Sequence, residues 1–114
     1  MENQDLTQGI EQDVRNALKV VEFGEMLNKL KNNPEFKAVI LDGYLAQEAI
    51  RLVLLKAEFD QDEGKRASVN TQIDAIGAFN KYLQAIHTKT LMAKSAIEDG
   101  NAQLAEIYNT GEDE

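Results

Sequence analysis

The chain has 114 residues, of which 43% are apolar and 28% charged, a composition typical of a folded domain rather than a disordered segment. Twenty acidic and twelve basic residues give a net charge of −8, which disfavours binding to phosphate backbones. The absence of cysteine excludes disulfides, thiolate catalysis and Cys-based zinc sites. No apolar run approaches the roughly 20 residues of a membrane span, so we expect no membrane partner.

The first predicted helix covers about residues 5–31. Its apolar residues recur mostly three or four positions apart, as on one face of an α-helix: Leu6, Ile10, Val14, Ala17, Leu18, Val21, Leu27 and Leu30. Gly24 interrupts this pattern and marks either a slight bend or a close contact with a neighbouring helix.

A second helix is predicted from Pro34 to about Phe59. Asn33-Pro34-Glu35 supplies a capping amide, a proline at the first helical position and an acid in the first turn. The second half of this helix is apolar over much of its circumference, which predicts a central place in the assembly. Asp42-Gly43 indicates a kink at 42–43, with a full break as the alternative.

Residues 60–66 are predicted to form a polar loop between helices. The loop begins with Asp60 and Asp62, but Gly64 stands fifth and Thr71 twelfth, where a calcium-binding EF-hand needs glycine sixth and glutamate twelfth. His87 has no carboxylate or metal ligand one helical turn away, and the glycines form no phosphate-binding loop. We therefore expect no cofactor, no metal and no enzymatic activity.

The third predicted helix covers about residues 67–108 and has the most regular pattern of the chain. Its seam residues alternate between spacings of three and four over more than five heptads, as in a coiled coil. They are Val69, Gln72, Ile76, Phe79, Leu83, Ile86, Thr90, Ala93, Ile97, Gly100, Leu104 and Ile107. Asp99-Gly100-Asn101 is a candidate end of the regular helix, and residues 110–114 are predicted to be a frayed acidic tail.

These elements predict a single all-α domain, an elongated antiparallel bundle or hairpin of three helices with a long, coiled-coil-like C-terminal helix. At 1.5 Å per residue the first two helices are each about 40 Å long and the third roughly 50 to 60 Å, so the third overhangs the others. An overhanging apolar seam favours self-association. The predicted interaction residues are Ile76, Phe79, Leu83, Ile86, Ile97 and Leu104, although the same pattern fits packing within one chain.

Charge is unevenly distributed along the third predicted helix. Between Lys65 and Ile97 five bases accompany one acid, Asp74, whereas no base follows Glu98. One interpretation is solvation of an exposed face. The other is a basic stripe that faces an acidic end of a second chain in antiparallel or staggered pairing.

Several stretches between Glu22 and Asp99 together resemble a group of small acidic helical proteins of tailed bacteriophages. They are Phe23-Gly24-Glu25 with Leu27 and Leu30, Asn33-Pro34-Glu35-Phe36, Gly43-Tyr44, Glu48-Ala49-x-Arg51-Leu52-Val53, Asp74-Ala75-Ile76 and Ala96-Ile97-Glu98-Asp99. The resemblance implies a phage product that acts in the bacterial host cytoplasm or is built into the virion. It brings no assigned activity and no functional residues.

Two hypotheses of function follow. The first is a non-enzymatic assembly or interaction protein that forms a homo-oligomer through the third helix and binds a larger viral or host protein. The second is an acidic inhibitor that imitates nucleic acid and blocks a host DNA- or RNA-processing enzyme. Direct nucleic-acid binding by the five bases between Lys65 and Lys94 is not expected, because they offer few simultaneous phosphate contacts.

Overall fold

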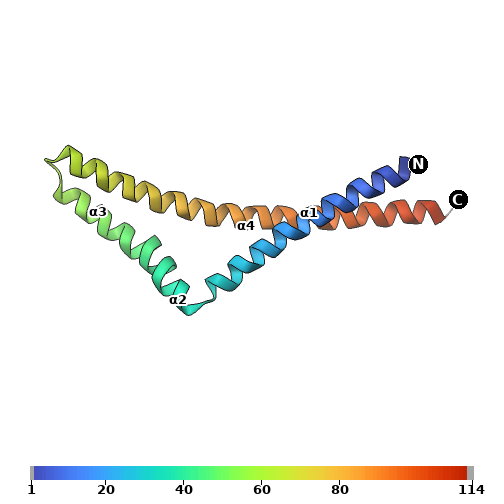
Figure 1. Ribbon diagram of the computed structural model, residues 1–114, viewed down its shortest axis with the longest axis horizontal. Helices are drawn as coiled ribbons and strands as arrows, with labels where there is room; N and C mark the ends of the chain where they lie inside the picture. Colours follow the sequence, from blue (N-terminus) through green and yellow to red (C-terminus); the bar gives the residue numbers. More distant parts are fainter. Residues whose placement is uncertain (1, 113–114) are drawn as a thin grey trace. The chain divides into compact units, whose positions relative to one another are not determined.

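The computed structural model describes residues 2–112 and confirms an all-α fold with a long C-terminal helix (Figure 1). Only residues 32–33 and 59–62 lie between helices in this range. The helices in chain order are α1 (Glu2–Lys31), α2 (Pro34–Phe36), the π-helix η1 (Lys37–Glu48), α3 (Ala49–Glu58) and α4 (Glu63–Glu112). They form two compact units: unit 1 comprises Met1–Met26 and Ile86–Glu114, and unit 2 comprises Leu27–Ala85.

Side-chain caps set the helix starts. The Asn33 side chain accepts a hydrogen bond from the Phe36 backbone N–H at 2.9 Å, and Pro34 opens α2 as predicted. Asp62 accepts one from the Lys65 N–H at 3.1 Å, so α4 begins at Glu63. The predicted loop over 60–66 was therefore too long at its C-terminal end, because Asp62 acts as a cap rather than as a loop residue.

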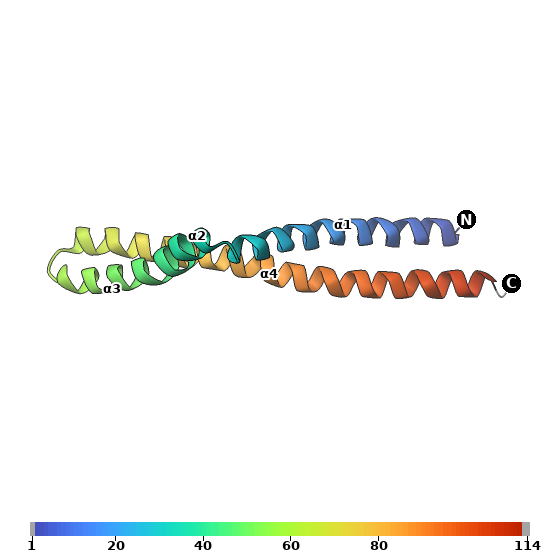
Figure 2. The ribbon, with the colours of Figure 1, turned by 90° about the horizontal axis from the view of Figure 1, so that it is seen from below.

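In unit 1, α1 and the second half of α4 pack antiparallel and in close contact. A Cβ added to Gly24 would overlap the Thr90 side chain, with the Thr90 Cγ2 at 2.7 Å, and a Cβ added to Gly100 would lie 2.6 Å from Val14 Cγ2. These contacts are ten residues apart on both helices, in opposite directions. Figures 1 and 2 show the blue part of α1 beside the red part of α4, with the start of α1 and the end of α4 at the same end of this unit.

Gly100 is thus a packing residue, and the predicted helix end at residues 99–101 was wrong. A glycine inside a helix costs roughly 0.5–1 kcal/mol relative to alanine, and here the close approach of α1 offsets that cost. Residues 110–112 of the predicted tail are also helical. Asp113 and Glu114 lie outside the described residues.

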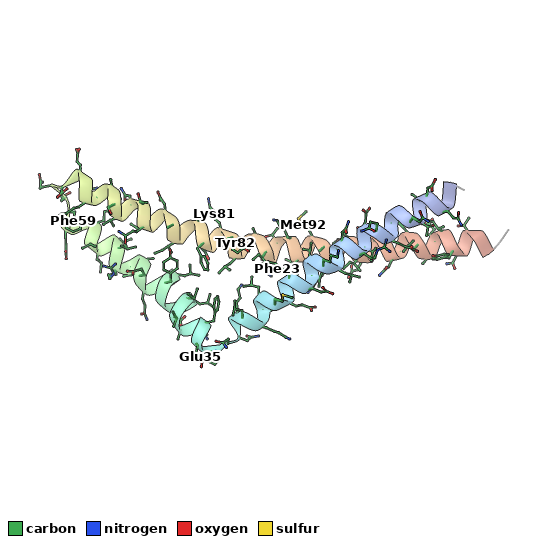
Figure 3. All side chains as sticks on the ribbon, viewed as in Figure 1. Phe23, Glu35, Phe59, Lys81, Tyr82 and Met92 are labelled. Carbon is green, nitrogen blue, oxygen red and sulfur yellow. The ribbon has the colours of Figure 1, made fainter. Side chains whose placement is uncertain are left out.

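In unit 2, α3 packs antiparallel against the first half of α4 (Figure 2). The core contains Leu52 of α3 with Val69 and Ile76 of α4, and Leu52 is the most completely buried of the large side chains. Tyr44 of η1 meets Phe79 edge to face, with the ring centroids 5.9 Å apart. Phe59 marks the turn between the helices, and the Lys65 Nζ lies 5.3 Å from its ring centroid (Figure 3).

The helix continues through residues 42–43 with π-helical winding over η1, so the alternative of a full break at this point is wrong. Gly43 has no positive φ, so the chain continues as a right-handed helix through this point. A π-turn holds more residues than an α-turn. The half-buried positions of this stretch fall in groups centred about four residues apart: Phe36; Ile40 and Leu41; Gly43, Tyr44 and Leu45; Glu48 and Ala49.

We predict that Gly24→Ala destabilises the protein by about 1–3 kcal/mol, because the new methyl group overlaps the buried Thr90 side chain. Gly9→Ala is the matched control on the same helix, since nothing lies within 4 Å of its added Cβ. We expect this control to stabilise by about 0.5–1 kcal/mol through helix propensity alone. Urea unfolding of both variants measures the difference, and equal effects would contradict the close packing of α1 on α4.

Candidate interaction surface

The structure buries a large part of the predicted α4 seam within the chain. Of the six predicted interaction residues, Ile76, Leu83 and Ile86 are buried, and Phe79, Ile97 and Leu104 are half-buried. Ile76 belongs to the core of unit 2, and Phe79 contacts Tyr44. The folded chain therefore uses these side chains to pack its own helices.

Thr90 and Gln72, two polar residues of the predicted seam, differ in burial. Thr90 is buried, and its hydroxyl donates to the Ile86 carbonyl at 2.7 Å, so it packs against Gly24 with its polar group satisfied. Gln72 is exposed, and its side-chain amide donates to the Ser68 carbonyl at 3.4 Å. Including Gln72 in the seam was wrong, because Ile73 packs against the core instead.

An apolar surface remains open on the outer side of α3. Ile50, Val53 and Leu54 are 61%, 57% and 65% exposed, while Leu52 on the opposite side of the same helix is buried. Together with Ala49 they line a shallow, open hollow. Ala57, also exposed, continues the face one turn further. We call Ile50, Val53, Leu54 and Ala57 the α3 outer face.

The α3 outer face differs from ordinary exposed apolar residues because its members are contiguous. Single exposed apolar side chains are normal on protein surfaces and need no explanation. Here the spacing of three, one and three residues places four apolar side chains on one helix face. Full burial of a Val, Leu or Ile side chain contributes about 1.5–3 kcal/mol, so this face provides a driving force for association.

Polar side chains near the α3–α4 turn stabilise the turn itself. Arg66 pairs with Asp60 at 3.0 Å, and Asp62 caps α4. His87 and Ser95 are exposed on α4. Nowhere in the described part of the chain do three or more His, Asp or Glu side chains gather in a way that could hold a metal ion.

The charge of the chain is divided sharply between the two units. Unit 1 contains twelve acidic and four basic residues, whereas unit 2 contains eight of each. The whole net charge of −8 therefore belongs to unit 1, and unit 2, which includes the α3 outer face, is neutral. The bases of unit 2 include Lys81, which lies on the side of α4 turned away from α3 (Figure 3).

Among residues 2–112, no helix combines the length and hydropathy that crossing a membrane requires. Comparisons with protein-family models, with curated proteins and with solved structures gave no match.

We predict that Leu83→Glu lowers the free energy of unfolding by about 3 kcal/mol or more, because it places a charge where the side chain is only 6% exposed. The adjacent control Tyr82→Glu changes a residue that is 56% exposed and should cost less than about 1 kcal/mol. Chemical denaturation followed by circular dichroism measures both. A folded Leu83→Glu variant of unchanged stability would show that this part of the seam is not packed within the chain.

Proposed function

We propose that this chain is a non-enzymatic interaction protein that self-associates and binds a larger protein. The observation that carries the proposal is the α3 outer face. The core of unit 2 uses one side of α3, yet the opposite side is also apolar and is left open. A helix with apolar residues on two opposite sides typically buries both of them. We infer that the surface of another protein packs against the exposed side of α3.

The proposal places the protein in a bacteriophage, acting either in the host cytoplasm or within the virion. The support is the resemblance of segments such as Asn33-Pro34-Glu35-Phe36 and Glu48-Ala49-x-Arg51-Leu52-Val53 to small acidic phage proteins. The second of these segments lies at the junction of η1 and α3 and reaches into the α3 outer face.

A second candidate function is an acidic inhibitor that imitates nucleic acid. The observation that favours it is the charge of unit 1, where the acidic N-terminal part of α1 lies beside the acidic C-terminal part of α4. Such a surface can occupy the basic groove of a DNA- or RNA-processing enzyme. Self-association through unit 2 is not required for this activity.

The first proposal predicts that the mass in solution rises with protein concentration. Light scattering behind a sizing column, from micromolar to millimolar concentration, should show a monomer at the low end and a defined oligomer at the high end. The measurement should be made at moderate salt, which screens the repulsion between the acidic units of two copies. A strict monomer over the whole range would contradict self-association.

The second candidate predicts that the protein displaces duplex DNA from basic host proteins at low salt, and that displacement weakens as salt rises. Fluorescence anisotropy of labelled DNA measures this competition. Glu98→Gln combined with Asp99→Asn should weaken it, whereas Glu48→Gln, in the neutral unit 2, is the matched control. Failure to displace DNA at any salt concentration would exclude the inhibitor function.

A further inference from the structure

We propose that the α3 outer face binds the same face of a second copy of this chain, with the two α3 helices antiparallel across a two-fold axis. The proposal rests on the self-association proposed above and identifies the surface responsible. Three observations support it: the shape of the apolar face, the charges beside it, and the neutrality of unit 2.

The first observation is that the face can complement itself. A two-fold interface uses the same patch on both copies. Side chains of the patch on one copy must therefore fit into the spaces of the identical patch on the other copy. The branched side chains of Ile50, Val53 and Leu54 are exposed and, together with Ala49, line the hollow, so one surface offers both the side chains and the space that receives them. Val53 and Leu54 lie at the middle of the face, and a two-fold axis near them places each opposite the other copy's pair.

The second observation is the arrangement of charge on one flank. Arg51 and Glu58 are both exposed and are seven residues apart, which places them two turns apart on the same side of α3. An antiparallel second helix reverses their order, so a two-fold axis level with Leu54 brings Arg51 of each copy toward Glu58 of the other. Arg51 donates through Nε to Glu48 of its own chain, and its two terminal nitrogens still offer donors to Glu58.

The third observation is that unit 2 has no net charge, with eight acidic and eight basic residues. Two copies therefore meet at this unit without the repulsion that two copies of unit 1, each with a net charge of −8, would feel. A strongly acidic or basic partner meets no net charge of opposite sign on unit 2. A second copy gains it twice, through the Arg51–Glu58 pairs.

The main test is Leu54→Glu, examined by sedimentation equilibrium over a range of protein concentrations. Leu54 is 65% exposed, so the variant should keep wild-type helicity and thermal stability. Burying two glutamates near the two-fold axis should raise the dimer Kd by roughly 100-fold or more. Leu91→Glu is the matched control, because Leu91 is similarly exposed at 53% but lies on α4 in unit 1. It should dimerise like the wild type.

The outcomes separate this inference from the proposed function. A Leu54→Glu variant that dimerises as well as the wild type would overturn the α3 interface while leaving self-association in place. A wild-type protein that stays monomeric would overturn both. Equal loss of dimer in the Leu54→Glu and Leu91→Glu variants would also overturn the α3 interface, because the effect would then follow added charge rather than position.

A charge exchange tests the antiparallel orientation. Arg51→Glu should weaken the dimer roughly tenfold, because it places like charges opposite each other. Adding Glu58→Arg to this variant should restore most of the affinity. If the double variant is as weak as Arg51→Glu alone, the antiparallel arrangement is wrong.

Discussion

The apolar seam of α4 is the surface on which the other helices pack. In unit 2 it contributes Val69 and Ile76 to the core around Leu52, and in unit 1 it contributes Thr90 and Gly100 to the contacts with α1. Because side chains on one helix face repeat every three or four residues, a single seam serves both units without a break in the helix. This use of the seam within one chain decides which apolar surfaces are left for other proteins.

Small residues set how closely α1 approaches α4 in unit 1. Ala17 and Gly24 of α1 and Ala93 and Gly100 of α4 are all buried. A glycine opposite a larger residue, as in Gly24 with Thr90 and Gly100 with Val14, brings two backbones close and lets the neighbouring methyl groups fill the space. The packing is therefore specific in register. A shift of one helix along the other would put Thr90 or Val14 against a residue with a Cβ.

The sequence predicted the helices and most of the seam, because both depend on spacing along a single helix. It could not decide between packing within the chain and packing between chains, since Leu83 and Ile86 have the same apolar character in both. The predicted helix end near Gly100 was wrong. A glycine that ends a helix and a glycine that makes room for a neighbouring helix cannot be told apart from the sequence of that helix alone. The winding of η1 was missed for another reason. The apolar residues Phe36, Ile40, Leu41 and Leu45 recur at spacings that an α-helix also allows, so the sequence pattern did not distinguish the two windings.

The prediction that the second half of the second helix is central followed from its apolar circumference, and the single chain covers only half of it. Leu52 is buried, while Ile50 and Leu54 on the opposite side are exposed.

Hydrophobicity alone cannot tell which partner covers such a face, so charge has to discriminate among the candidate partners. Unit 2 is neutral and unit 1 holds the whole net charge of −8. An acidic second copy meets the least repulsion at unit 2, and burial of the exposed apolar side chains on this surface stabilises the contact. Both effects favour the α3 outer face as the contact between copies, and they leave the acidic surface of unit 1 open to a basic partner.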